Sequence, residues 1–498
     1  MLMSPADRPL AAVLVSLLAA GLILASRRSP NLREGWTFLA ALVKLSLVAS
    51  LVPAVLAGEV LESAPLLLAP GLALQLRADA FGLLFALVAS TLWLVTSLYS
   101  VGYMRAGGYV NQTGYFAAFA VCVSATIGVA FAGNLLTFFV FYEILTIATY
   151  PLVVHFRTAE ALAAGRTYLI YTLVAGQALL VAIAWTQTIV PGASFQPGGY
   201  LAGQAAAPTL MVLFLLFIAG VGVKAGIMPL HGWLPAAMVA PTPVSALLHA
   251  VAVVKAGAFG CVRVVGYVFG VDLLAELGMA QVLAAVAAVT IIVASVRALG
   301  EGHLKRRLAY STIGQLSYIV LGAALGSAAA VAGAMFHIAA HGAMKITLFF
   351  CAGAIYAKAH VEEIADLGGI GRTMPITMAA FTVSAFGLAG VPLVAGFVSK
   401  WNLGVGAIEA GHAGYIVVLF ASGLLNFAYF FPIVQTAFFG GNRPVSFSDG
   451  QLALTIPLAV TAVAAVVLGI NPDAALNLYQ LAWQAARSVV SAGTGGAL

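Results

Sequence analysis

Apolar stretches of eighteen or more residues recur from one end of this 498-residue chain to the other. Because about twenty helical residues cross the hydrocarbon of a bilayer, the length accommodates about fourteen crossings. Only 8% of the residues are charged, against about 25% in ordinary soluble domains. The stretches are continuously apolar rather than alternating, which favours helices over a barrel. The expected fold class is therefore an all-α polytopic membrane protein.

The apolar stretches define the predicted spans, with boundaries accurate to about three residues. They are 10–26, 36–57, 80–102, 115–132, 134–155, 165–190, 209–240, 243–268, 278–299, 308–326, 330–357, 374–408, 413–437 and 453–470. The first could pass for a signal peptide, but no clear A-x-A cleavage site follows it. We therefore interpret it as a span, and no extended soluble domain fits between the spans.

Charged residues in the loops separate by sign across the predicted membrane. Nearly all loop cations lie on one side, namely Arg27, Arg28, Arg33, Arg105, Arg157, Lys305, Arg306, Arg307, Lys358, Arg372 and Arg443. The opposite loops hold Glu59, Glu62, Asp79, Asp272, Glu276 and Glu409. The positive-inside bias predicts that the basic side is cytoplasmic and that both termini lie outside. Arg77 and Arg263 run against this pattern.

Two predicted spans are too long for one crossing and contain proline. One reads VKAGIMPLHGWLPAAMVAPTP, with Pro229 and Pro235, and the other reads LAGVPLVAGFVSKW, with Pro392. Proline removes an intrahelical hydrogen bond, so both spans should be broken helices. Corresponding interrupted helices point to the internal repeats of a transporter. Lys224 precedes its break whereas Lys400 follows its own, as an inverted relation would produce.

Several ionisable side chains lie deep within the spans, where each costs at least about 2.5 to 3.5 kcal/mol and needs a partner or a function. Glu143 is the deepest carboxylate; it is either a structural partner for a lysine or, as we favour, a proton-binding group. Burial disfavours the charged form of Lys224 and Glu143 favours it, which suits a proton relay. Lys44 has neither a partner nor a break nearby, so we expect it to snorkel to the membrane surface.

The helix that begins at Pro243 carries His249 and Lys255. Six residues apart, the two side chains differ by about 120° around an ideal helix, so they need a water or a local distortion to communicate. For Lys255, a functional role is favoured over snorkelling.

His337, His341 and Lys345 are spaced at i, i+4 and i+8, which aligns them on one helix face. A zinc site would need a third and usually a fourth ligand, and no acid or cysteine accompanies the two histidines. Proton transfer near neutral pH suits this file of imidazoles better, and no metal is expected. Lys400 completes a row that begins at Glu143.

Several motifs of energy-converting proteins are missing from the sequence. GVGVKA, at 220–225, lies within an apolar span and follows no strand, so it is no nucleotide loop. No Walker motif, cysteine cluster or nucleophile elbow occurs, and Cys122, Cys261 and Cys351 lie singly in apolar stretches, where packing is their expected role. One deep carboxylate among lysines is also a poor sodium site. We therefore expect a proton-handling subunit without a cofactor or catalytic chemistry of its own.

Four segments form a distinctive set: Lys224 followed by PLHGWLPAAMVAPTPVSALLHAVAVVKAG, then HLKRRLAYSTIGQLSY, HIAAHGAMKITLFF and LAGVPLVAGFVSKW. Over about residues 75 to 440 they resemble the antiporter-like subunits shared by Mrp-type multisubunit cation/proton antiporters, respiratory complex I and membrane-bound hydrogenases. The resemblance implies fourteen helices with two inverted five-helix repeats, each with a broken helix, around a hydrated axis. The implied parts are 1–103 with three helices, 104–268 and 269–440 with one repeat each, and 441–498 with a last transmembrane helix and tail.

The resemblance also implies roles for the buried groups. Glu143 looks like the family's essential glutamate on its fifth helix, Lys224 like its partner lysine on the broken seventh, and Lys255 like the connecting lysine of the eighth. A proton would pause on Lys224 under the control of Glu143 and then pass through Lys255.

The histidines and the last lysine complete the implied route. His337 and His341 resemble the central-axis histidines, and Lys400 resembles the exit-side lysine of the broken twelfth helix. His249 matches only some subfamilies.

The implied function is that of a proton-translocating subunit of a multisubunit Na⁺ or K⁺/H⁺ antiporter in the plasma membrane of a prokaryote. Its partners would be other membrane subunits, with no nucleic acid. The length and Lys400 favour an Mrp-type D subunit, whereas APTPVSALLHA also resembles the large A-type and complex I forms. A complex I or hydrogenase subunit, and then a subunit of a bicarbonate-uptake assembly, are the alternatives. A carrier with its own small-molecule site is disfavoured because the buried groups form a row.

Overall fold

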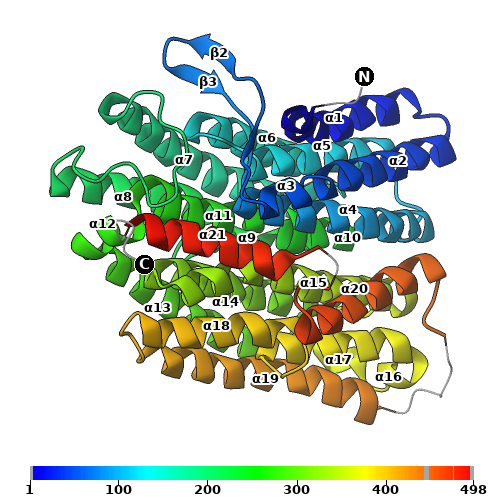
Figure 1. Ribbon diagram of the computed structural model, residues 1–498. Coiled ribbons are helices and arrows are strands. Elements are labelled where there is room, and N and C mark those ends of the chain that lie inside the picture. The colour runs from blue at the N-terminus through cyan, green and yellow to red at the C-terminus, as the bar shows by residue number, and fades with distance from the viewer. Residues whose placement is uncertain (1–3, 442–447, 475, 494–498) are drawn as a thin grey trace.

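Long helices run alongside one another through the whole computed structural model, which describes residues 4–441, 448–474 and 476–493 (Figure 1). The α-helices are α1 (Arg8–Ala25), α2 (Pro30–Ala49), α3 (Val52–Leu56), α4 (Ala80–Ala106), α5 (Gln112–Ala130), α6 (Leu135–Val153), α7 (Ala159–Ile189), α8 (Ala207–Ala225), α9 (Trp233–Ala236), α10 (Thr242–Ala246), α11 (Val253–Arg263), α12 (Val271–Glu276), α13 (Met279–Gly300), α14 (Leu304–Leu325), α15 (Ala328–Ala359), α16 (Ile370–Thr373), α17 (Pro375–Ala389), α18 (Ala395–Glu409), α19 (Tyr415–Phe439), α20 (Leu452–Ile470) and α21 (Leu478–Gly493). The 3₁₀ helices are η1 (Pro5–Asp7), η2 (Ala237–Val239) and η5 (Ile364–Leu367), and the π-helical turns are η3 (Leu247–Val251) and η4 (Val264–Phe269).

The described residues contain 13 helical segments that are long and apolar enough to cross a membrane. The remaining predicted span, 374–408, forms the two shorter helices α17 and α18, of 15 residues each. Every predicted span is thus occupied by helix, and the all-α polytopic fold class is confirmed. The predicted division into four parts stays a prediction.

Strands are confined to two small antiparallel pairs within the described part of the chain. β1 (Leu61–Glu62) pairs with β4 (Arg77–Ala78), with Leu61 opposite Ala78. β2 (Leu66–Ala69) and β3 (Leu72–Leu74) form a hairpin that projects from the bundle (Figure 1).

Both predicted broken helices are broken in the structure. α8 ends at Ala225 and α17 at Ala389, and the glycine after each has a left-handed backbone, with φ of 70° at Gly226 and 102° at Gly390. A left-handed glycine is the usual residue after a helix end because it has no Cβ to clash. The shared Ala-Gly phrase therefore marks where each helix stops, and the nearby prolines prevent it from resuming directly.

The two cations that ran against the charge pattern are paired with acids of their own side. Arg77 lies 3.3 Å from Glu62, and Arg263 lies 2.6 Å from Asp79. Arg263 is 1% exposed in its side chain, so this second ion pair is buried. Arg443, one of the predicted cytoplasmic cations, lies outside the described residues.

Lys44 does not snorkel, contrary to the prediction from sequence. Its side chain is fully buried, and its Nζ donates a 2.5 Å hydrogen bond to Oγ of Ser16 on α1. The ammonium also lies 5.0 Å from the ring centroid of Trp93 on α4. Neighbouring helices thus hold the charge in place, and the sequence around Lys44 contains no trace of these distant partners.

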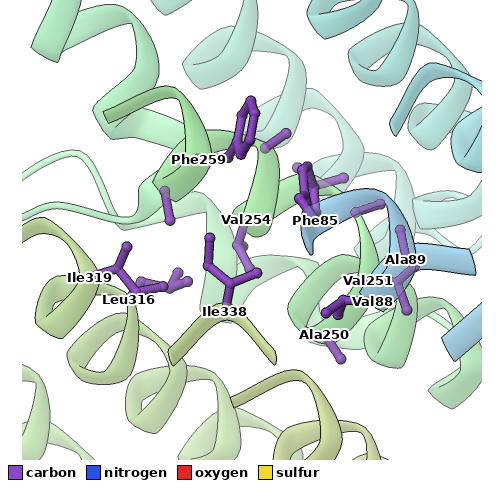
Figure 2. Packing of buried hydrophobic residues seen from close by; sticks show 14 of the residues in the cluster. Phe85, Val88, Ala89, Ala250, Val251, Val254, Phe259, Leu316, Ile319 and Ile338 are labelled. Atoms are coloured by element: carbon purple, nitrogen blue, oxygen red, sulfur yellow. The ribbon is translucent and has the colours of Figure 1, made fainter. Parts of the chain in front are cut away.

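Apolar side chains from four helical segments fill the centre of the bundle. Figure 2 shows Phe85 of α4, Val254 of α11, Leu316 of α14 and Ile338 of α15 among them, and all four are fully buried. This packing fixes the helices that carry most of the predicted site residues.

A helix that the span pattern does not predict, α21, lies across the front of the bundle between the helices near the N-terminus and α17 to α20 (Figure 1, red). It packs against α4 and α15, and Leu481 and Ala485 are buried there. Nε2 of Gln484 donates a 2.7 Å hydrogen bond to the carbonyl of Val55. With 16 residues and polar side chains on one face, α21 is too short and too amphipathic to be predicted as a span.

Candidate functional site

Glu143 lies near the middle of α6 and is half-buried. Its carboxylate faces Gly176 of α7, where a Cβ would lie only 2.6 Å from Oε1. Glycine at this position therefore leaves room for the carboxylate. Oε1 has no hydrogen-bond partner among the described residues.

Lys224 lies in the last turn of α8 and is 1% exposed. Its Nζ donates a 2.6 Å hydrogen bond to the carbonyl oxygen of Tyr142, and it lies 3.3 Å from the centroid of that tyrosine ring. Within the described ranges no direct ion pair joins Lys224 to Glu143, although the two are close enough to interact electrostatically. The predicted pair is thus present as neighbours in an open arrangement.

The end of α8 is held by two contacts. The indole N–H of Trp233 donates a 2.8 Å hydrogen bond to the carbonyl of Val223, one of the carbonyls that a helix end leaves without an intrahelical partner. A Cβ on Gly257 of α11 would lie 2.2 Å from the backbone nitrogen of Ala225, so this glycine lets α11 pack directly on the break. The two contacts bring the segment after the break beside Lys224.

Lys255 and His341 meet directly in the centre of the bundle. Nζ of Lys255, on α11, lies 2.7 Å from Nδ1 of His341, on α15, and both side chains are fully buried. An amine and an imidazole at this distance share a hydrogen bond along which a proton can pass.

His249 sits in the π-helical turn η3, so the helix is distorted between it and Lys255, as the spacing required. The distortion continues at Ala252, whose φ of −122° and ψ of −80° are not helical. The His249 ring lies 4.6 Å from the ring of Phe349, and neither ring nitrogen has a partner in the described chain. No described hydrogen bond joins His249 to Lys255.

His337 and His341 share a face of α15 as predicted, with ring centroids 5.9 Å apart. Nδ1 of His337 lies 2.7 Å from Oγ of Ser399, on α18, immediately before Lys400 in the sequence. The histidine file therefore leads from Lys255 to the helix after the second break.

Lys345 is fully buried but points toward α14 rather than along the file. Its Nζ donates to Oγ of Ser311, at 2.9 Å, and to the carbonyl of Leu308, at 3.3 Å. The shared helix face brings Lys345 near the histidines, and its hydrogen bonds take it to a different neighbour.

Lys400 is half-buried on α18, and its Nζ donates a 2.6 Å hydrogen bond to the carbonyl of Leu388. Leu388 is the penultimate residue of α17, where carbonyls lack helical partners and carry partial negative charge. The ammonium also lies 4.7 Å from the ring centroid of Tyr318. The broken helix itself thus provides the counter-charge for this lysine.

All eight predicted site residues lie inside the helical bundle, in three groups. The first contains Glu143 and Lys224; the second contains Lys255 and the three histidines; the third contains Lys345 and Lys400. Within the described chain, no hydrogen bond joins the first group to the second. No three potential ligands among the histidines, cysteines and acids of the described residues lie together as a metal site.

Several polar residues of the site were missed from the sequence. They are Tyr142, Ser311, Tyr318, Ser399, Asn426 and Tyr429. Hydroxyls are common in apolar helices, and no local pattern distinguishes these from the others. Asn426 alone carries a signal, since an amide in the middle of GLLNFAYFF needs a partner.

Comparison with known proteins gives a consistent picture. The family model described as NADH:quinone oxidoreductase/Mrp antiporter, TM matches residues 132–425, more than half of the chain. NADH-quinone oxidoreductase subunit N of Desulforudis audaxviator (strain MP104C) is 32% identical over 410 residues, which are 78% of this chain and 81% of that protein.

Two further comparisons concern antiporters. A probable K(+)/H(+) antiporter protein of the A/B type from Rhizobium meliloti (strain 1021) is 32% identical over 450 residues, 87% of this chain but only 44% of its own length. The chain therefore spans less than half of that relative. A chain of the Mrp complex from Dietzia sp. DQ12-45-1b has the same fold, with a TM-score of 0.88, 24% identity, and coverage of 99% of this chain and 98% of that one.

Proposed function

Because this chain belongs to the NADH:quinone oxidoreductase/Mrp antiporter family, we propose that it translocates protons as one membrane subunit of a multisubunit Na⁺ or K⁺/H⁺ antiporter. The row of buried ionisable side chains from Glu143 to Lys400 carries the proposal, above all the 2.7 Å contact between Lys255 and His341. Ionisable groups at membrane depth are costly, and a row of them suits the movement of a small positive charge.

In the proposed mechanism, a proton pauses on Lys224. When the carboxylate of Glu143 approaches, it stabilises the buried ammonium; when it moves away, the cost of the buried charge drives the proton toward Lys255. The proton then passes to His341 and along the file toward Lys400. The open arrangement of Glu143 and Lys224 suits the second of these states.

The surface position of Glu143 supports a role within a larger assembly. The carboxylate is half-buried in the middle of an apolar helix, and Ile147, one turn away, is 65% exposed. A carboxylate facing lipid at this depth is unfavourable. We infer that another membrane protein of the assembly covers this face of α6.

A redox-driven complex is the second candidate. The chain covers 81% of a relative named as part of an NADH-quinone oxidoreductase, but less than half of the named antiporter protein. In such a complex the same row would carry protons, with the energy supplied by electron transfer in other subunits.

The first test measures Na⁺- or K⁺-dependent proton flux in vesicles that contain the complete natural assembly. We expect wild type and Lys358→Ala, a control outside the row, to show cation-dependent flux, and Lys224→Ala to lose it. Flux driven only by an electron donor and indifferent to both cations would favour the redox-driven candidate. Full flux in Lys224→Ala would rule out the proposed row.

We also propose that the basic loops face the cytoplasm of a prokaryotic cell and that both termini lie outside. The test uses a membrane-impermeant maleimide on intact cells, since Cys122, Cys261 and Cys351 are buried. Glu59→Cys should be labelled from outside, and Arg28→Cys only after the cells are permeabilised. The reverse pattern would invert the topology.

A further inference from the structure

A chain of hydrogen bonds leaves the histidine file at Lys345 and ends beside Lys400. Lys345 donates to Oγ of Ser311 at 2.9 Å, and that oxygen lies 2.9 Å from the hydroxyl of Tyr429 on α19. The Tyr429 hydroxyl in turn lies 2.6 Å from Oδ1 of Asn426. The four side chains are buried, so no bulk water competes for these contacts.

The proton positions along this chain follow from its ends. Nδ2 of Asn426 donates to the carbonyl of Leu388 at 3.2 Å, which leaves Oδ1, a pure acceptor, facing Tyr429. Tyr429 has one hydroxyl proton and gives it to Asn426, so it accepts the proton of Ser311. Ser311 in turn accepts from the Lys345 ammonium. All the donors therefore point away from Lys345 while it is charged.

Both ends of the chain meet at one backbone atom. The Leu388 carbonyl accepts from Asn426 and from Nζ of Lys400, at 2.6 Å. It is free to do so because the N–H groups of Gly390 and Val391 bond to Phe386 and Gly387 instead. Asn426 and Lys400 thus share the acceptor that the helix break exposes.

We propose that Ser311, Tyr429 and Asn426 transmit the charge state of Lys345 to Lys400, in parallel with the histidine file. Once Lys345 is a neutral amine, it accepts from Ser311, Tyr429 turns to Ser311, and Oδ1 of Asn426 loses its donor. The amide then rearranges and changes the hold on the Leu388 carbonyl that anchors Lys400. Tyr429 is a positioning residue in this scheme and carries no proton across the membrane.

This inference rests on the proposed function and adds a regulating connection to it. Charged and titratable groups that face Lys345 include Lys255, His249, His337 and His341, all of which it influences electrostatically. Arg307, which donates to the carbonyl of Tyr429 at 2.8 Å, faces the chain from the other side. None of these contacts changes when the Tyr429 hydroxyl alone is removed.

The test compares pH profiles of cation-dependent proton flux in vesicles with the complete assembly. Tyr429→Phe removes the central link, and Ser311→Ala removes the link beside Lys345. Each variant should lower flux by about tenfold, the effect of a lost hydrogen bond to a charged group, and move the profile toward lower pH. Tyr115→Phe, whose buried hydroxyl contacts Ser100 at 3.0 Å away from this chain, is the matched control and should match wild type.

Two outcomes would overturn the inference. One is a wild-type profile in both variants; the other is flux reduced by the same factor at every pH, which indicates a structural loss. Should Tyr429→Phe fail to assemble, the smaller change Ser311→Ala decides alone. Loss of flux in Lys224→Ala together with wild-type behaviour of these variants would reject only this inference, whereas full flux in Lys224→Ala would reject the proposed function.

Discussion

Two buried lysines of this chain have different surroundings. Lys224 lies against a carbonyl, an aromatic ring and a nearby carboxylate, at the broken end of a helix. Lys44 lies in the middle of an intact helix, and its described contacts are the hydroxyl of Ser16 and the ring of Trp93. Only Lys224 has a group that changes charge beside it, so only Lys224 is suited to relay protons.

Lys44→Met should raise the unfolding temperature in detergent and leave proton flux unchanged. The substitution keeps the length of the side chain and removes a buried charge without a carboxylate partner, which is unfavourable in an apolar interior. Thermal unfolding of the purified protein measures the first effect and vesicle flux the second. A lower unfolding temperature would show that the hydrogen bond to Ser16 is worth more than the buried charge costs.

Spacing along one helix predicted part of the site correctly. His337 and His341, four residues apart, do share a face, because the helical period fixes this locally. The hydrogen bond from Lys255 to His341 joins residues 86 positions apart, and the burial of Lys44 depends on helices α1 and α4. Such contacts depend on how helices pack, and in a membrane all helix surfaces have the same apolar composition.

Among whole elements, the broken helices were predicted and α21 was not. Each break carries its own chemistry in the sequence, a glycine that ends the helix and a proline that stops it resuming. α21 is stabilised by packing on α4 and α15, so its local sequence gives only an amphipathic pattern.

α4 begins with a residue that joins two elements. Asp79 caps α4 by accepting a 2.7 Å hydrogen bond from the N–H of Gly82, and it also pairs with Arg263 at the end of α11. Burial raises the pKa of the Asp79 carboxyl, but the Arg263 guanidinium outweighs burial and holds this pKa below its usual value. The ion pair thus connects the start of one helix to the end of another.

Asp79→Asn separates these two roles, because asparagine also caps helices but carries no charge. We expect a loss of about 3–5 kcal/mol, the cost of leaving a buried Arg263 without its partner. Since the pKa of Asp79 is lowered on folding, its contribution is present above the unfolded value of about 3.9 and is lost as the pH falls through the folded value. Unfolding in detergent at neutral and acid pH should therefore show a difference between variant and wild type that shrinks in acid. A constant difference would assign the loss to the cap.

At the scale of the molecule, the row of ionisable groups reaches the surface at both ends. Glu143 and Lys400 are half-buried, whereas Lys255 and the histidines between them are fully buried. Side chains of this kind are stable at membrane depth only when protein covers them. The isolated chain is therefore incomplete at α6 and at α18.

Ile147 lies one turn from Glu143 on the same face of α6 and reports on this cover. In Ile147→Cys, we expect a lipophilic maleimide to label the isolated protein in detergent and to leave it unlabelled within the complete assembly. Wild type is the control, since its three cysteines are buried. Equal labelling in both states would place the covering partner elsewhere.

The packed centre of the bundle has a consequence for the cell that holds this protein. Val254, Leu316 and Ile338 fill the space around the row, and His249 lies among apolar neighbours without a described partner for its ring. A continuous chain of proton carriers would short-circuit the membrane and drain its gradient. The conformation described here is electrically insulated, so the protein at rest loses no energy, and conduction requires that these side chains first move apart.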